Sequence, residues 1–360
     1  MRVLLAPDKF KGTLTAPAAA LALADGLRRI HPRAVVTSCP IADGGSGTLE
    51  ALLDAKGGTK SFVNSCDPWG KPFRMPIASL GDGTVCVETA TASTGDPLRA
   101  DSEGVGMCIR RAVELGGNGR VVVAVGGTAS TDGGIGLAKA LGWRFLDGFG
   151  DPLPPGPAQL IHLRYIESPT QPLQATVTAL CDVDTPLLGP NGSARRFAPQ
   201  KGADPDQVET LERGLENLSM IVREVLGTNM NVARAGAGGG IAAGLLAFAG
   251  AELRSGFESV AEAMQLRPLI AAADVVVTGE GSFDEQSLAG KAPAGVARIA
   301  HEAGVPCLGI FGRLDVPVPQ ALGTGFSDVF DLTSVAAGPK ADPAETLSRG
   351  AELLFGRQPF

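Results

Sequence analysis

The sequence contains few histidines, few aromatic residues and no closely spaced cysteine pair. Only three histidines and one tyrosine occur among its 360 residues. Each histidine falls in an expected helical tail or a proline-flanked connection, so neither a histidine general base nor a histidine-rich metal site is expected. Any general base would therefore be a carboxylate. The six cysteines show no Cys-x-x-Cys spacing, which argues against a zinc ribbon or a thioredoxin-like pair.

Several motifs are missing as well. No Gly-x-x-x-x-Gly-Lys-Ser/Thr loop and no Gly-x-Ser-x-Gly elbow occurs, so neither a P-loop protein nor an α/β-hydrolase is indicated. No apolar run approaches the roughly 20 residues that cross a bilayer. The net charge is −7, without a basic run that resembles a nucleic-acid footprint. The N-terminus meets an acid too early for a secretory signal, so we expect a cytoplasmic protein that binds neither membrane nor nucleic acid.

Glycine, in contrast, is abundant. The chain has 49 glycines, which predicts many loops where the backbone approaches a neighbour closely or takes positive φ. Hydrophobic residues make up 44% and charged residues 19%, as is typical of compact globular folding. A chain of this length is long enough for two cores, so two domains are expected. The glycine-rich loops, more than the helices, should hold the function.

Five apolar runs each end in a glycine-rich or acidic loop. Short β-branched runs bounded by glycine predict buried strands. In open α/β sheets the ligand lies beyond the carboxyl ends of the strands, so acids gathered there indicate metal and phosphate chemistry. The runs with their loops are Val3–Asp8, Cys39–Gly45, Val121–Gly134, Ala175–Asp184 and Asp274–Asp284.

The order of the expected elements predicts an α/β fold. The first residues are typical of strand, loop and helix, and the segment from 271 to 311 repeats this pattern with a strand expected over 271–278. We therefore predict that residues 1–75 and 265–360 form one Rossmann-like, doubly wound domain. Residues 76–264 would form a second, mixed α/β domain inserted into it.

The acids have structural alternatives. Aspartate commonly caps helices and tightens turns, and Asp43 precedes an expected helix, so it could equally be a cap. Asp182 and Asp184 are two apart on an extended segment and would point the same way, which favours metal or shared-ligand chemistry. Glu280 and Asp284, followed by Lys291, form the set most typical of a functional site.

Lysines accompany the same loops. For a single loop lysine the ordinary interpretation is a solvated surface charge. Repetition beside glycines and opposite acids favours phosphoryl transfer, which needs cations against phosphate oxygens, carboxylates for magnesium and an acceptor for the hydroxyl proton. The lysines are Lys9, Lys11, Lys201 and Lys291.

Seven ordered segments together resemble the type-1 glycerate kinases, the bacterial glycerate 2-kinase family. They are Ala6–Thr15, Ala42–Thr48, Gly126–Gly134, Cys181–Leu187, Gly189–Pro190, Pro199–Gly202 and Gly279–Gln286 with Gly290–Pro293. The resemblance implies ATP- and magnesium-dependent phosphorylation of D-glycerate, with 2-phosphoglycerate as the expected product. It also implies a Rossmann-like domain with an inserted α/β domain and an active-site cleft between the two. Lys9 departs from the family pattern, in which serine is usual.

Individual roles combine this resemblance with the chemistry of each residue. The predicted catalytic residues are Asp8, Lys11, Asp284 and Lys291. The predicted substrate-binding residues are Asp43, Gly44, Gly45, Glu280 and Gln286. The predicted nucleotide-binding residues are Gly126, Gly127, Asp132 and Lys201. The predicted magnesium ligands are Asp182 and Asp184. Lys11 and Lys291 would neutralise the substrate carboxylate or the transferring phosphoryl group, and Asp8 or Asp284 would orient the acceptor hydroxyl.

Three alternatives stay open. The first is a kinase for another small hydroxy acid, and the second is a non-catalytic metabolite-binding regulator on the same fold. The third is an NAD-dependent oxidoreductase, because residues 238–243 fit the loose form Gly-x-Gly-x-x-Ala. No convincing strand precedes that segment, so a helix start packed closely on a neighbour is the favoured interpretation. The sequence carries no feature that sets an oligomeric state.

Overall fold

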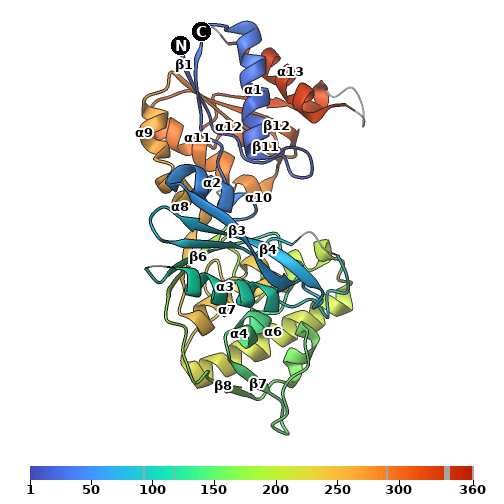
Figure 1. Ribbon diagram of the computed structural model, residues 1–360. Helices are drawn as coiled ribbons and strands as arrows, with labels where there is room; N and C mark the ends of the chain where they lie inside the picture. Colours follow the sequence, from blue (N-terminus) through green and yellow to red (C-terminus); the bar gives the residue numbers. More distant parts are fainter. Residues whose placement is uncertain (92–93, 117, 289–290, 336–340, 359–360) are drawn as a thin grey trace. The chain divides into compact units, whose positions relative to one another are not determined.

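The chain divides into two compact units. Unit 1 comprises residues 1–43 and 257–360, and unit 2 comprises residues 44–256. The structure is a computed structural model that describes residues 1–91, 94–116, 118–288, 291–335 and 341–358 (Figure 1).

Unit 1 is built on a five-stranded sheet with all strands parallel, in the order β13-β12-β11-β1-β2. Successive side chains of β1 face opposite sides, so Leu4 lies in one apolar core while Val3 and Leu5 lie in another. Both faces of the sheet are therefore covered. The strands are β1 (Arg2–Leu5), β2 (Val35–Ser38), β11 (Val275–Phe283), β12 (Cys307–Leu314) and β13 (Asp328–Asp331).

Helices supply the cover on both faces (Figure 1). Helices α1 (Ala16–Ile30) and α13 (Pro343–Phe355) pack on the side of Val3, and α1 begins where the Thr15 side chain accepts a hydrogen bond from the Ala18 amide at 3.3 Å. The other helices of unit 1 are α8 (Gly256–Ala263), α9 (Leu266–Ala271), α10 (Glu285–Leu288), α11 (Ala292–Glu302), α12 (Val318–Leu322) and the short 3₁₀ helix η4 (Leu332–Ser334).

Strand β11 is longer than the sequence predicts. We expected the strand to end at Thr278 and a loop to follow, but β11 continues to Phe283 and pairs with β12 as far as Leu314. Glycine permits this close pairing, because a Cβ at position 279 would lie 1.9 Å from the Ile310 carbonyl oxygen. Glu280 therefore stands on a strand, where it is opposite Phe311 of β12.

Unit 2 contains a six-stranded sheet in the order β10-β9-β6-β5-β4-β3. Its first four strands are parallel, and β4 and β3 are antiparallel. The strands are β3 (Gly58–Cys66), β4 (Pro72–Leu80), β5 (Val85–Glu88), β6 (Arg120–Val125), β9 (Thr176–Cys181) and β10 (Glu252–Ser255), with a separate hairpin of β7 (Arg144–Leu146) and β8 (Tyr165–Glu167).

Helix α6 of unit 2 is the longest helix among the described residues and begins at Pro205. Asp204 and Gln207 form a reciprocal capping box at its start, at 2.8 and 3.0 Å. The α-helices are α2 (Thr48–Lys56), α3 (Glu103–Leu115), α4 (Ile135–Ala140), α5 (Ser193–Phe197), α6 (Pro205–Leu226) and α7 (Ile241–Ala249). The 3₁₀ helices are η1 (Pro157–His162), η2 (Pro199–Lys201) and η3 (Ala237–Gly240).

The boundary between the units differs from the expected one. We placed residues 44–75 with the first strands, but the structure places them in unit 2. Strand β3 pairs with β4 over nine residues, from Gly58 opposite Leu80 to Cys66 opposite Pro72, and β4 continues the sheet to β5. Strand β3 thus finds its hydrogen-bond partner in the next strand along the chain, and the alternation of strands and helices in the sequence does not reveal this pairing.

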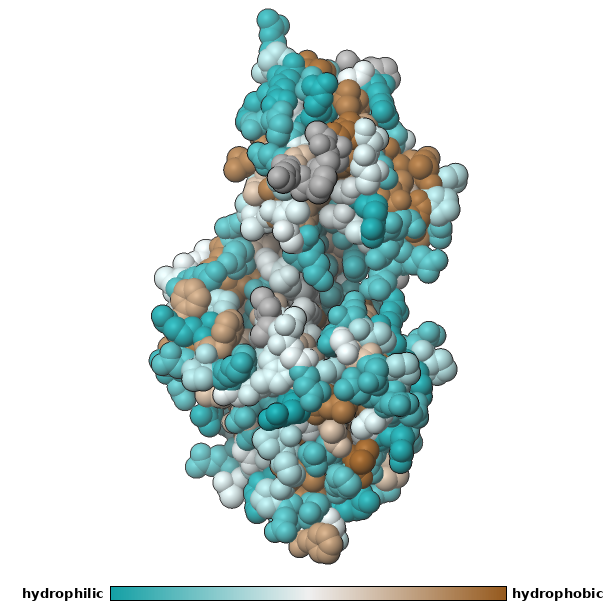
Figure 2. Space-filling view, turned by 90° about the vertical axis from the view of Figure 1, so that its right-hand side faces the viewer, coloured by the Kyte–Doolittle hydropathy of each residue, from teal (hydrophilic) through white to brown (hydrophobic). Residues whose placement is uncertain are grey.

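The surface of the molecule is largely hydrophilic on the face that Figure 2 shows. On the face shown in Figure 2 hydrophilic residues predominate and the hydrophobic residues form small patches. Among the described residues, no helix combines the length and apolarity needed to span a membrane.

Candidate functional site

Three predicted acids of unit 1 meet at the carboxyl ends of its parallel strands. Asp8 follows β1, and its amide donates a hydrogen bond to the Gly279 carbonyl at 2.9 Å, next to Glu280 on β11. Asp43 follows β2, where the Ile41 amide donates to the Pro7 carbonyl at 2.9 Å. The residues are largely buried, with exposed fractions of 2% for Asp8 and 8% for both Asp43 and Glu280. The structure therefore brings together side chains that are more than 270 positions apart.

Lys9 lies among these acids, although the sequence analysis assigned it no individual role. Its Nζ is 3.4 Å from Asp8 Oδ1 and 3.3 Å from Asp43 Oδ1. Its backbone amide also donates to Asp8 Oδ1, at 2.6 Å. The signal available in the sequence was its position directly after Asp8, but a lysine in a loop is more commonly solvated. Here it bridges two buried carboxylates.

Crowding and burial raise the pKa values of this cluster. Burial raises the pKa of Asp8 to about 8, with the negative charge of Asp43 as the next cause and Lys9 opposing it. Burial also raises the pKa of Glu280 to about 7, against the Ser287 hydroxyl and the Lys291 charge, which lower it. Since these groups interact, the two protonation steps belong to the cluster as a whole. The cluster exchanges protons near neutral pH, where a general base is effective.

Glu280 has an unsatisfied oxygen. Its Oε1 atom is buried and accepts no hydrogen bond within the described part of the chain. A buried acceptor without a partner costs free energy on the order of 1–3 kcal/mol, and such groups are rare unless a ligand or another group completes them. Glu280 is therefore a candidate ligand contact on the grounds of its geometry.

The other predicted residues of unit 1 make fewer contacts with this cluster of acids. Asp284 Oδ1 accepts hydrogen bonds from the amides of Gln286 and Ser287, at 2.8 and 3.0 Å, so it caps α10. This is the structural alternative for an aspartate before a helix. Lys291 precedes α11 and its charge acts on Glu280. Lys11 is exposed.

In unit 2, glycines and Asp182 pack closely at the ends of β6 and β9. A Cβ at position 126 would lie 3.0 Å from Asp182 Oδ2 and 3.0 Å from the Gly45 Cα atom. Gly127 has φ +65°, and a Cβ there would lie 3.1 Å from the Ala90 Cβ. Close packing therefore requires glycine at both positions, and of the two only Gly127 is exposed.

Lys201 lies beside the loop that follows β6. Its Nζ donates hydrogen bonds to the Ser130 carbonyl oxygen at 2.6 Å and to Thr131 Oγ1 at 3.3 Å. Burial lowers its pKa to about 8, against the charges of Asp132 and Asp182, which raise it. A partly desolvated ammonium group with carbonyl and hydroxyl partners is suited to exchange them for the oxygens of an anion.

Asp132 is fully buried and structural in its contacts. Its Oδ2 accepts from the Ser102 amide, the Ser102 hydroxyl and the Gly136 amide at 2.8–3.0 Å, and its Oδ1 accepts from the Gly134 amide at 3.1 Å. Both oxygens are engaged in shaping the loop and the start of α4. We therefore assign Asp132 an indirect part in the predicted nucleotide site, through the loop that it holds.

The glycine loop of residues 44–47 leads into α2, whose N-terminus is already occupied by an anionic side chain. Glu88 Oε1 accepts a hydrogen bond from the Thr48 amide at 3.0 Å. Gly44 has φ +102°, and a Cβ there would lie 2.6 Å from the Gly256 Cα atom, so glycine is required for packing. Gly44 thus has a structural reason to be glycine, independent of the substrate contact predicted for Gly44 and Gly45.

The two predicted magnesium ligands make different contacts. Asp182 lies against Gly126, whereas Asp184 pairs with Arg234 at 3.0 Å and its side chain is 64% exposed. No group of three or more histidine, cysteine or acidic side chains suited to a metal ion occurs among the described residues. Magnesium in kinases is commonly held by only one or two carboxylates together with substrate phosphates. Asp182, beside the glycine loop and Lys201, fits such a shared site better than Asp184.

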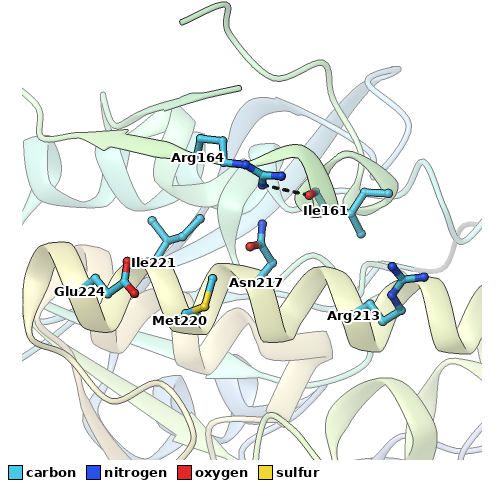
Figure 3. A pocket seen from close by; sticks show the side chains of 7 residues that line it. All are labelled: Ile161, Arg164, Arg213, Asn217, Met220, Ile221 and Glu224. Atoms are coloured by element: carbon cyan, nitrogen blue, oxygen red, sulfur yellow. Dashed lines mark hydrogen bonds between the residues drawn. The ribbon is translucent and has the colours of Figure 1, made fainter. Parts of the chain in front are cut away.

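A separate pocket of about 420 Å³ lies between α6 and the segment around η1, and none of the predicted site residues lines it (Figure 3). Arg164 on one wall is turned back on its own segment, donating to the Ile161 and Leu163 carbonyls at 3.2 and 2.6 Å. The lining residues are Ile161, Arg164, Arg213, Asn217, Met220, Ile221 and Glu224.

The fold and these residues define an α/β protein with polar side chains gathered at the carboxyl ends of parallel strands. The chain belongs to the glycerate kinase family, whose model matches residues 3–354. This confirms the resemblance seen in the motifs.

Similar proteins and a solved structure support the same family. The chain is 37% identical over 349 residues to a glycerate 2-kinase of Escherichia coli (strain K12), with 93% of this chain and 91% of the relative covered. It is 35% identical over 327 residues to a glycerate kinase of Bacillus subtilis (strain 168), with 87% and 85% covered. A crystal structure from Salmonella typhimurium LT2 that carries the name glycerate kinase 2 is similar with a TM-score of 0.80, 32% identity, and 99% and 97% covered.

Proposed function

We propose that this protein transfers the γ-phosphoryl group of ATP to the 2-hydroxyl of D-glycerate, giving 2-phosphoglycerate and ADP. The observation that carries the proposal is the cluster of Asp8, Lys9, Asp43 and Glu280 in a chain of the glycerate kinase family. The glycerate 2-kinase relative supports the choice of hydroxyl. We also propose that unit 1 is a Rossmann-like domain, because its parallel sheet is covered by helices on both faces.

The acids of unit 1 suit a substrate with hydroxyl groups. A buried carboxylate can accept a hydrogen bond from the acceptor hydroxyl, orient its oxygen and take its proton as that oxygen attacks phosphorus. Asp8 is the candidate, because the contacts of Asp284 are those of a helix cap. Lys9 remains paired with Asp8 and Asp43, and Lys11 and Lys291 are the cations proposed to balance the charge of the substrate and the transferring group.

The glycine loop and Lys201 suit the phosphates of a nucleotide. The exposed backbone at Gly127 could approach phosphate oxygens closely, and the Lys201 ammonium group could balance their charge. Asp182, with its carboxylate against Gly126, is the residue proposed to hold Mg²⁺. When bound, Mg²⁺ neutralises charge on the phosphate oxygens.

The reaction is tested by incubating the purified protein with ATP, Mg²⁺ and D-glycerate. ADP should form only when D-glycerate is present, and phosphorus NMR should identify 2-phosphoglycerate. A 3-phosphate product would contradict the regiochemistry, and the lack of glycerate-dependent ADP would contradict the whole proposal. A panel of other small hydroxy acids in the same assay tests the alternative acceptor, and tight glycerate binding without turnover would indicate the regulator.

Lys201→Met is expected to raise the KM for ATP by about 10–100-fold, because a hydrogen bond to a charged group contributes roughly 1.5–3 kcal/mol. The measurement is an ATP titration at saturating D-glycerate. Lys139→Met is the matched control, since Lys139 also donates to main-chain carbonyls, at 3.0 and 3.4 Å, but lies outside the glycine loops. Equal KM values for the two variants would contradict the assignment of Lys201.

A further inference from the structure

The surroundings of Glu280 carry more negative than positive charge. Asp8 is affected by the charges of Asp43, Lys9 and Glu280. Glu280 is affected by the charges of Lys291, Asp43 and Asp284. With Lys11, whose backbone lies beside Gly281, counted as well, the four acids would carry four negative charges against three positive ones if all were ionised. D-glycerate would bring a further negative charge to this place. Binding of such an anion is unfavourable unless an acid is neutral.

We propose that D-glycerate binds to the protein together with one proton, which Glu280 holds and donates as a hydrogen bond to the substrate carboxylate. This inference rests on the proposed function, because it concerns how the same site accepts its substrate. A neutral carboxyl group adds no charge beside the bound anion, and as a donor it makes a contact that an ionised carboxylate cannot make.

The geometry places this proton on Glu280 rather than on Asp8 or Asp43. Lys9 contacts Asp8 through both its amide, at 2.6 Å, and its Nζ, at 3.4 Å, and its Nζ also pairs with Asp43 at 3.3 Å. These donors favour the charged forms of the two aspartates, against the burial that raises the pKa of Asp8 to about 8. Glu280 Oε1 is buried without a hydrogen-bond partner in the described structure. Its unsatisfied oxygen is therefore the atom best placed to carry a proton toward a ligand.

A dependence of affinity on pH follows. The pKa of Glu280, raised to about 7 by burial, separates two regimes. Below it the acid is already protonated and the affinity for D-glycerate is constant. Above it the proton must be taken up on binding, so Kd should rise by about tenfold for each pH unit. Glutamine at this position is neutral at every pH and can donate through its amide.

Calorimetry with D-glycerate, in the presence of MgADP, tests the proposal. At pH 8 the wild-type protein should take up about one proton per glycerate bound, measured from the binding enthalpy in two buffers of different ionisation enthalpy. Glu280→Gln should show no proton uptake, and its Kd should be constant from pH 6 to 9 and close to the wild-type value at pH 6. Asp8→Asn should retain the uptake, even where turnover is lost.

Several outcomes would overturn the proposal: no uptake by the wild-type protein at pH 8, unchanged uptake in Glu280→Gln, or uptake that disappears in Asp8→Asn. Circular dichroism verifies that each variant is folded, and the wild-type measurement alone decides the matter if Glu280→Gln does not fold. Intact turnover with a Kd independent of pH would overturn only this inference. If the protein shows no glycerate binding and no glycerate-dependent ADP formation at any pH from 6 to 9, the proposed function is overturned as well.

Discussion

Asp8→Asn is expected to lower kcat by about 10²–10⁴-fold, the usual contribution of a positioned general base. Asparagine keeps the size of the side chain but cannot accept the proton of the attacking hydroxyl. It also removes one of the two carboxylates that Lys9 bridges, at 3.4 Å, so the orientation of the remaining groups would change. The measurement is the rate of ADP formation at saturating ATP and D-glycerate, with folding verified by circular dichroism.

Two further variants define the specificity of this effect. Asp25→Asn is the control, because Asp25 lies on α1 of the same unit, its side chain is 66% exposed, and it forms an ion pair with Arg28 at 3.7 Å on the same helix. It should leave kcat unchanged. Asp284→Asn removes the charge but keeps an oxygen that can cap α10, so it should change both stability and kcat little. If Asp284→Asn lowers kcat more than Asp8→Asn does, the two aspartates have the opposite roles.

Gly239→Ala is expected to lower the free energy of unfolding by more than about 3 kcal/mol, which is exceptional for one substitution. Gly239 has φ +70°, and a Cβ there would lie 1.9 Å from the Ser130 carbonyl oxygen. That oxygen accepts the hydrogen bond from Lys201, at 2.6 Å. Any shift that relieves the clash would therefore displace the lysine, so protein that still folds should also have a raised KM for ATP.

Gly250→Ala separates the clash from the backbone strain. Gly250 has φ +61° and ends α7, but a Cβ there would meet nothing within 4 Å. Its substitution should cost only the strain of a left-handed alanine, about 1–2 kcal/mol. Urea denaturation of both variants gives the comparison. Equal losses would show that the contact with Ser130 is not rigid and would remove the reason to link Gly239 with Lys201.

Much of the local structure could be predicted because its causes are local in the sequence. The start of α6 needs only Asp204, Pro205 and Gln207, which lie within four positions, and α1 likewise begins at Thr15. Neither depends on distant residues. The order of strands and helices, the glycine loops and the family resemblance could be read for the same reason.

The roles of single side chains could not be read in this way. Asp132 and Asp8 look alike in the sequence, since each is an acid near a strand end. Asp132 nevertheless has both oxygens occupied by the Ser102 residue and the amides of α4, whereas Asp8 faces other acids across the sheet. The difference depends on partners 30 or more positions away. Lys9 acquired its role for the same reason, through Asp43.

The sequence by itself determined the family, the α/β class and the loops in which acids and glycines gather, because these depend on composition and on neighbours along the chain. Only the tertiary structure decided that β3 joins unit 2, that β11 extends past Glu280, and that Lys9 bridges two buried acids. Strand pairing and desolvation depend on which distant segments meet. The pKa of a carboxyl group follows from that meeting rather than from its neighbours in sequence.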